Sequence, residues 1–131
     1  MCFGCGEDNP IGLHIHYVDD PDGSSSTTLR LTDSYSGEPG IAHGGVQATV
    51  LDEVMGHAAR KAVIATAGRR ITAVTASFEL RYRAPCPVNQ QIYARGSVTS
   101  VEWPSVHVVG VITDGESRVL TEATARWRVL V

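Results

Sequence analysis

The chain carries, ahead of its longest apolar run, the sequence Gly40-Ile41-Ala42-His43-Gly44-Gly45-Val46-Gln47-Ala48-Thr49-Val50-Leu51-Asp52-Glu53. Two glycines let another group approach the backbone closely, and the start of a helix offers unpaired N–H donors. A carboxylate follows about two to three helical turns later, within an otherwise apolar segment. Such a carboxylate suits acid–base or nucleophilic chemistry. The stretch therefore predicts an enzyme.

Two acidic residues of this stretch differ in their expected surroundings. The helical pattern runs from Gly44 to about Thr66, and at roughly 100° per residue Glu53 falls in the middle of the polar side, where solvated residues are typical. Asp52 falls at the edge of the apolar side, well past the N-cap position that aspartate favours. Partial burial raises the pKa of a carboxyl group, which suits a general base. The alternative interpretation is that Asp52, too, is a solvated surface residue.

The remaining pattern predicts an α+β fold. Strands are expected at residues 13–18 and 26–32, followed by a loop at 33–42 and the helix. Alternation then begins at Val74 with an apolar face of Val74, Ala76, Phe78, Leu80 and Tyr82, and strand-like runs follow at 91–103, 105–113 and 118–131. Hairpin turns separate the later runs, so the sheet should be antiparallel and the single helix should cover one face of it.

Composition limits the possible functions. The 131 residues, with 43% hydrophobic and 19% charged side chains, predict one globular domain covering residues 1–131. A net charge of -3 gives no reason to expect nucleic acid or an anionic membrane as a partner. No apolar run is long enough to span a membrane. The first residues lack the pattern of a signal peptide, and three cysteines fit a reduced cytoplasmic setting.

The motifs resemble one known family. His43-Gly44-Gly45 with Asp52 nine positions after the histidine, and Tyr82-Arg83-Ala84-Pro85 at the end of the following strand, resemble hotdog-fold acyl-CoA thioesterases of the 4-hydroxybenzoyl-CoA and phenylacetate-pathway type. The opening Cys2-Phe3-Gly4-Cys5-Gly6 resembles the start of one large branch of that superfamily. The resemblance implies an antiparallel sheet of five to six strands wrapped around one long central helix. It also implies a homodimer paired edge to edge, or a dimer of dimers, with the site at the interface.

The same resemblance implies roles for individual residues. The Gly44 N–H, with or without that of Gly45, would polarise the thioester carbonyl. Asp52 would act as the base that activates water or as the nucleophile that forms an anhydride. His43 would orient the loop or the acyl carbonyl, and Thr75 would help to hold the water.

Two positions depart from what the family pattern requires. Some members carry an asparagine that contacts the thioester where this chain has Gly37, so that contact would be absent or made by the backbone. Simple alternation places Thr75 on the face away from the helix, so it would reach the site only through a bulge or in a neighbouring subunit. Arg81 and Arg83 share one strand face and are candidates for the phosphates of CoA, with plain solvent exposure as the alternative.

A metal site is the main alternative use of the cysteines. Cys2-x-x-Cys5 together with His14 and His16 offers four ligands of the types that zinc prefers. The chain has no second Cys-x-x-Cys, and the resemblance explains the motif without a metal. We therefore expect no metal and no other cofactor.

Three functional classes follow for the chain. The favoured one is hydrolysis of an acyl-CoA to the free acid and CoA. The others are a hotdog hydratase, which uses a different arrangement of acid and histidine, and a protein that binds acyl-CoA without turnover.

Overall fold

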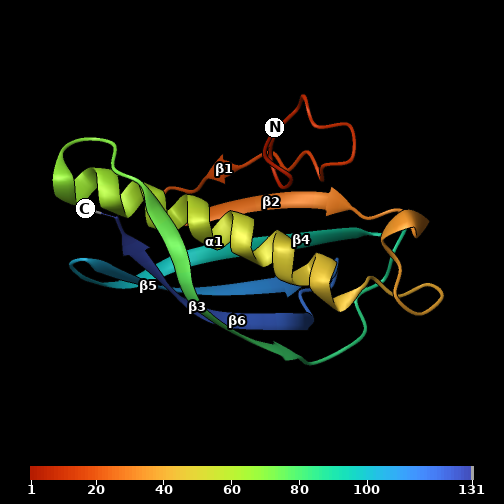
Figure 1. Ribbon diagram of the computed structural model, residues 1–131. Coiled ribbons are helices and arrows are strands. Elements are labelled where there is room, and N and C mark those ends of the chain that lie inside the picture. The colour runs from red at the N-terminus through yellow and green to blue at the C-terminus, as the bar shows by residue number, and fades with distance from the viewer. Residues whose placement is uncertain (131) are drawn as a thin grey trace.

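One long helix lies across a six-stranded antiparallel sheet (Figure 1). The computed structural model describes residues 1–130. The helix is α1 (Gly44–Ala67), and a short 3-10 turn, η1, precedes it at Asp33–Tyr35. In chain order the strands are β1 (Val18–Asp19), β2 (Ser25–Arg30), β3 (Ala73–Tyr82), β4 (Gln91–Glu102), β5 (Ser105–Thr113) and β6 (Val119–Val129). This arrangement confirms the hotdog architecture that the resemblance implied.

The strand order leaves β3 at one side of the sheet. The order is β1-β2-β4-β5-β6-β3, and each neighbouring pair is antiparallel. Within residues 1–130, the 10-residue strand β3 pairs with β6 alone, so its other edge has no strand partner. An unpaired edge of this length can accept a strand from another molecule.

Helix α1 begins and ends as its sequence predicts. At its start the His43 Nδ1 accepts a hydrogen bond from the Gly45 N–H at 2.9 Å. At its end Gly68 adopts the left-handed conformation, with φ of 71°, that glycine tolerates best. The apolar side predicted from the helical period is confirmed, because the buried residues include Val50, Leu51, Val54, Met55, Ala58 and Ala59.

Two glycines let α1 approach the sheet closely. A Cβ at Gly96 of β4 would lie 2.7 Å from the Met55 Cα, and one at Gly110 of β5 would lie 2.4 Å from the Met55 Sδ. A side chain at Gly96 would collide with the helix backbone, and one at Gly110 would displace the Met55 side chain. The middle of the helix therefore packs closely on the two central strands.

Two predicted strands differ from the structure. Residues 13–17 do not form a strand, because the Leu13 and Ile15 N–H groups bond to the Phe3 and Gly4 carbonyls rather than to a sheet neighbour. In β3 the predicted apolar face is wrong at its start, where Val74 is 43% exposed. A shift in register between Thr75 and Ser77 is the reason, because it exchanges the faces on either side of it. The final strand was predicted to reach residue 131, which lies outside the described residues.

No helix within residues 1–130 has the combination of length and apolar character needed to cross a membrane.

Candidate active site

Asp52 and Thr75 form the central pair of the candidate site. The Thr75 hydroxyl of β3 donates a hydrogen bond of 2.7 Å to the Asp52 Oδ1 of α1. Asp52 is half-buried between the helix and this strand. The carboxylate is therefore held in one orientation by a neutral donor, and among residues 1–130 no cation pairs with it directly.

A β-bulge brings Thr75 to the helix. In the pairing of β3 with β6, Thr75 lies opposite Trp127 and Phe78 lies opposite Ala125, so one extra residue is inserted between them. Trp127 and Ala125 both face the core. Thr75 and Phe78 consequently point to the same face although they are three residues apart. Of the two routes by which Thr75 could reach the site, the bulge is the one present within the chain.

Burial dominates the electrostatics of Asp52. Removal of the carboxyl group from water raises its pKa above the ordinary value, and the hydrogen bond from Thr75 partly opposes that rise. Negative charge on Glu53 raises the pKa further, and Arg60 lowers it. A carboxylate with a raised pKa accepts a proton from water more readily, as a general base must.

The start of α1 offers one unused donor. The Gly45 N–H donates to the His43 Nδ1, so it is not available to a ligand. The Val46 and Gln47 N–H groups both bond to the His43 carbonyl. Among residues 1–130, the Gly44 N–H has no hydrogen-bond acceptor. Because the His43 Nδ1 accepts, a neutral imidazole carries its proton on Nε2, which becomes a second donor at the same end of the helix.

Two residues that the sequence analysis did not assign hold this helix start. The Tyr82 hydroxyl donates to the Gly44 carbonyl at 2.9 Å. The buried Gln47 side chain donates to the Ala42 carbonyl at 2.9 Å and accepts from the Thr121 hydroxyl. A lone amide within an apolar helical run is the sequence signal that marks Gln47. Tyr82 belongs to the Tyr-x-x-Pro motif, but the sequence alone assigned no function to its side chain.

Gly37 lies beside the helix start but offers it no free donor. Its N–H bonds to the Ile41 carbonyl at 2.9 Å, and a Cβ at this position would lie 3.3 Å from the His43 Cα. An asparagine side chain here would point at His43. The backbone N–H of Gly37 therefore does not replace the contact that some family members make with asparagine.

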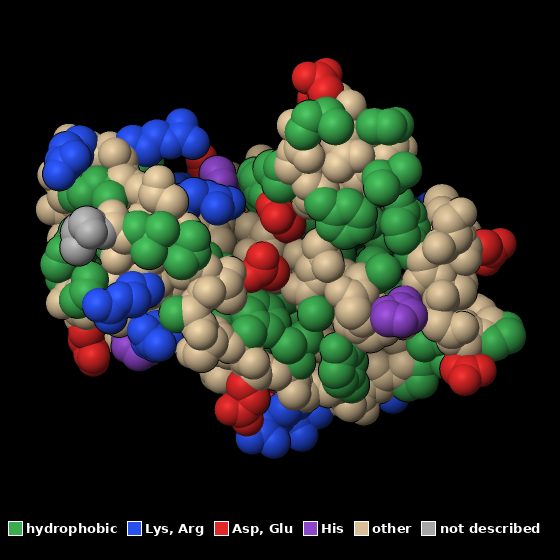
Figure 2. All heavy atoms as spheres, viewed as in Figure 1, with side chains coloured by type: hydrophobic (Ala, Val, Ile, Leu, Met, Phe, Trp, Pro, Cys, Tyr) green, Lys and Arg blue, Asp and Glu red, His purple; other side chains and the backbone are tan. Residues whose placement is uncertain are grey.

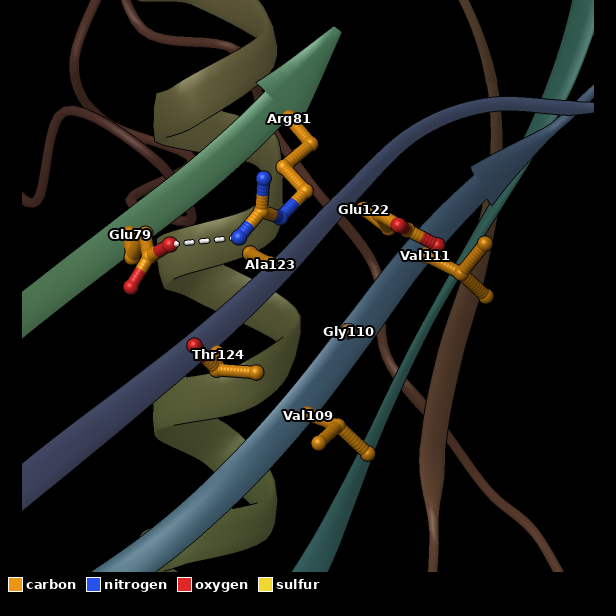
Figure 3. A pocket seen from close by; sticks show the side chains of 8 residues that line it. All are labelled: Glu79, Arg81, Val109, Gly110, Val111, Glu122, Ala123 and Thr124. Carbon is orange, nitrogen blue, oxygen red and sulfur yellow. Dashed lines mark hydrogen bonds and ion pairs between the residues drawn. The ribbon is translucent and has the colours of Figure 1, made fainter. Parts of the chain in front are cut away.

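Arg81 and Arg83 pair with acidic residues that lie on the face of the sheet turned away from Asp52. Arg81 pairs with Glu79 at 3.1 Å in a hollow of about 280 Å³ on the face of the sheet turned away from α1 (Figure 3). The Arg83 Nε donates to Glu122 at 2.8 Å. Both guanidinium groups thus have acidic partners, and neither shares a face of the sheet with the Asp52–Thr75 pair.

Other cations gather on the helix side of the sheet. A hollow of about 620 Å³ near the end of α1 is lined by His57, Arg60, Lys61, Ile64, Arg70, Ile71, Thr72 and Ala73. Figure 2 shows Lys and Arg side chains concentrated over the end of the molecule that holds the second half of α1. Lys61 pairs with Asp19 at 3.0 Å, whereas Arg60 and Arg70 have no acidic partner among the described residues.

The helix start and the carboxylate are well separated within one chain. Asp52 lies eight positions after Gly44, which corresponds to about 12 Å along the axis of a helix. The N–H groups at a helix start also point away from the rest of the helix. A carbonyl group bound by the Gly44 N–H would therefore lie beyond the helix, on the side opposite to Asp52 of the same chain.

Comparison with known proteins agrees with the fold and the motif. A long helix that lies across an antiparallel sheet defines the hotdog fold. A His-Gly-Gly sequence at the start of that helix is the motif that resembles the thioesterases of this fold. The family model of the thioesterase superfamily matches residues 39–121. The chain belongs to the thioesterase superfamily. No curated protein matches it significantly.

Several solved structures resemble the chain. A crystallised thioesterase superfamily protein is 30% identical over 93% of this chain, with a TM-score of 0.80, and the chain spans 60% of that protein's length. A Streptococcus mutans UA159 protein bound to acetyl CoA is 17% identical, with a TM-score of 0.77 and 95% of both chains covered. The Escherichia coli PaaI protein, from the phenylacetic acid degradation operon, is 13% identical, with a TM-score of 0.78 and 91% and 81% of the two chains covered.

Proposed function

We propose that this protein hydrolyses an acyl-CoA thioester to the free acid and CoA. The observation that carries the proposal is the half-buried Asp52, held by Thr75 and raised in pKa, in a chain whose helix start leaves the Gly44 N–H free. Related proteins with the same fold have been solved with CoA or acetyl CoA bound. These features supply a base and an oxyanion donor, which thioester hydrolysis requires.

The separation of the two groups leads to a specific arrangement. We infer that each site combines the Gly44 N–H of one protomer with Asp52 of the other protomer in a two-fold symmetric homodimer. The open edge of β3 supports this arrangement, because antiparallel pairing of two copies of β3 would set the two α1 helices in opposite directions. The start of one helix would then approach the middle of the other.

The reaction can be written from these groups. Asp52 takes a proton from water while the water oxygen adds to the thioester carbon. The carbonyl oxygen becomes an oxyanion and accepts a hydrogen bond from the Gly44 N–H of the other protomer. The intermediate then expels the CoA thiolate, which receives the proton from Asp52, so that acid and CoA leave and the carboxylate is restored.

A second route uses Asp52 as the nucleophile. The carboxylate would add to the thioester carbon, release CoA and form a mixed anhydride that water then hydrolyses. A single turnover in water labelled with heavy oxygen tests for this route. Label in the Asp52 side chain identifies an anhydride that water attacks at the aspartyl carbon, whereas label in the product acid alone is expected both from direct attack on the thioester and from attack at the acyl carbon of the anhydride.

Two pairs of arginines are candidates for the phosphates of CoA. Arg81 and Arg83 would have to give up their ion pairs with Glu79 and Glu122. Arg60 and Arg70 line the hollow on the same side of the sheet as Asp52. The exposed ion pairs of Arg81 and Arg83 cost little to break, but only Arg60 and Arg70 lie on the Asp52 side of the sheet, so we favour Arg60 and Arg70.

The test is thiol release from a panel of short, medium, long and aromatic acyl-CoAs. We expect Asp52→Asn to lower kcat/KM by roughly 10² to 10⁴ on every substrate that the wild type hydrolyses, because a general base contributes about that much. Glu116→Gln, an exposed turn residue, is the matched control and should leave the rate unchanged. Activity of Asp52→Asn near the wild-type value would refute the assignment, and binding of acyl-CoA without thiol release would identify a non-catalytic binder.

Stability measurements separate loss of chemistry from loss of folding. The raised pKa of Asp52 means that folding disfavours the ionised carboxylate. The contribution of this group to stability is therefore complete at pH values below its unfolded pKa. That contribution is lost as the pH rises through its folded pKa. Asp52→Asn avoids that loss. Its free energy of unfolding in urea should therefore exceed that of the wild type at neutral pH, and the difference should shrink toward acidic pH.

A further inference from the structure

The first turn of the chain brings two thiols to a carboxylate on α1. The ligand atoms of Cys2, Cys5 and Glu53 all lie within 4.8 Å of one another. Glu53 faces away from the Asp52–Thr75 pair, on the side of the helix that residues 1–17 cover (Figure 1). Glu53 was expected on the solvated side of the helix, and the covering segment leaves it half-buried.

The spacing fits a tetrahedral zinc ion. With zinc–sulfur bonds of about 2.3 Å and zinc–oxygen bonds of about 2.1 Å, a sulfur and an oxygen on one tetrahedron lie about 3.6 Å apart. The distance from the Cys2 Sγ to the Glu53 Oε1 is 3.7 Å. Two thiolates favour a soft or borderline ion such as zinc over magnesium or calcium, which prefer oxygen ligands alone.

The turn is built to approach Glu53 closely. A Cβ at Gly4, between the two cysteines, would lie 2.2 Å from the Glu53 Cδ, and one at Gly6 would lie 2.5 Å from the Cys2 N. The Phe3 and Gly4 carbonyls accept bonds of 2.8 and 2.9 Å from the N–H groups of Leu13 and Ile15. The backbone around the ligands is therefore held in place by the residues that follow it.

Neighbouring groups orient two of the three ligands. The Cys5 N–H donates to the Cys2 Sγ at 3.3 Å. The Tyr17 hydroxyl donates to the Glu53 Oε2, which leaves Oε1 directed at the thiols. The Tyr17 ring in turn stacks on His57, with ring centroids 4.2 Å apart. Hydrogen bonds that orient a ligand in this manner are characteristic of built metal sites.

We propose that Cys2, Cys5 and Glu53 bind one zinc ion, with water as the fourth ligand. Binding converts the two thiols to thiolates and releases their protons. The sequence predicted no metal, and the alternative ligand set weighed there differs from this one, because the His14 Nε2 bonds to the Asn9 carbonyl at 2.6 Å and the His16 Nδ1 lies 3.9 Å from Glu7. The ion fastens residues 1–17 to the outer side of α1.

The test is titration of the reduced, chelator-treated protein with Co²⁺ and then Zn²⁺. We expect sulfur-to-cobalt charge-transfer absorption that saturates at one Co²⁺ per chain and disappears when Zn²⁺ is added. Cys2→Ser and Cys5→Ser should each weaken zinc binding by at least roughly a hundredfold. Tyr17→Phe, which leaves all three ligands in place, should weaken it roughly tenfold, at the lower end of the range for groups that orient a ligand.

Cys86→Ala is the control, because Cys86 is the third thiol and lies buried in the core, apart from the site. It should keep the cobalt spectrum, and zinc should raise its melting temperature as in the wild type. Absence of charge-transfer absorption in the wild type, its persistence in the double substitution Cys2→Ser with Cys5→Ser, or a Cys2–Cys5 disulfide that survives reduction would each overturn the proposal. Glu53→Gln keeps the test decisive if the cysteine variants misfold, because it should bind zinc more weakly while both thiols remain.

Discussion

At the scale of single residues, a hydrogen bond from Thr75 of β3 orients the carboxylate of Asp52, the proposed catalytic base. The Thr75 hydroxyl donates to the Asp52 Oδ1 at 2.7 Å, and this bond lowers the pKa that burial raises. Helical position and motif spacing both selected Asp52 from the sequence. Neither feature predicted the β-bulge that brings Thr75 to Asp52. An extra residue in a strand cannot be recognised from an alternating pattern when the residues on both faces of the strand are small.

Loss of the Thr75 hydroxyl should change the pH dependence of catalysis. In Thr75→Val the carboxylate loses a donor, so the Asp52 pKa should rise and the acidic limb of kcat/KM should move to higher pH. Thr75→Ser keeps the hydroxyl and should keep the wild-type limb. The comparison requires pH–rate profiles of the three proteins on one acyl-CoA. An unchanged limb in Thr75→Val would show that the bond does not act on the ionisation that controls the rate.

At the scale of elements, contact between α1 and the central strands positions the site. Gly96 and Gly110 admit the helix to the backbone of β4 and β5, and Trp127 of β6 lies below Gly56 of α1. The sequence predicted the helix and its apolar side, because a 3.6-residue period over six turns is a strong signal. It did not predict the irregular course of residues 13–17, because bonds from there to Phe3 and Gly4 are contacts between segments that no local pattern encodes.

Gly96→Ala tests the close packing of the helix. The added methyl group would lie 2.7 Å from the Met55 Cα, so helix and sheet must move apart. Overpacking of this kind should reduce the free energy of unfolding by about 1 to 3 kcal/mol in urea. Gly115→Ala is the matched control, because nothing lies within 4 Å of a Cβ there, and it should change stability by less than about 0.5 kcal/mol. Equal effects of the two substitutions would contradict the packing described.

At the scale of the whole molecule, charge is distributed unevenly over the surface. Arg60 and Arg70 line the hollow beside the end of α1, while Arg81 pairs with Glu79 on the opposite face of the sheet. No local sequence pattern pointed to Arg60 or Arg70. The two residues come together only when the chain that follows α1 folds back over the helix. The sequence pattern favoured Arg81 and Arg83 instead, because they share one strand face and arginine pairs well with phosphate.

Substitution of these arginines should separate the two phosphate sites. The double substitution Arg60→Gln with Arg70→Gln should raise KM for an acyl-CoA by roughly tenfold or more, since a charged hydrogen bond contributes about 1.5 to 3 kcal/mol. It should leave KM unchanged for the same acyl group on N-acetylcysteamine, which has no phosphate. If Arg81→Gln raises KM for acyl-CoA and the double substitution does not, the phosphates bind on the outer face of the sheet.

The proposed active site is completed only by a second copy of the chain. The Gly44 N–H and Asp52 lie about 12 Å apart along one helix, and the donor points away from the carboxylate. Gly44→Pro removes the N–H and adds a pyrrolidine ring, whose Cβ would lie 3.4 Å from the Tyr82 ring and hydroxyl, at an ordinary van der Waals distance. Proline suits the first position of a helix, and His43, with φ of -57° and ψ of 136°, already has the conformation that precedes proline.

The most direct test mixes two inactive proteins, Asp52→Asn and Gly44→Pro, and allows their subunits to exchange. In a mixed dimer one site would contain both substitutions, and the other would contain the intact Gly44 of one chain and the intact Asp52 of its partner. Random exchange of equal amounts should therefore restore roughly one quarter of wild-type thiol release, with neither protein active alone. Complete subunit exchange without any recovery of activity would contradict a site shared between two protomers.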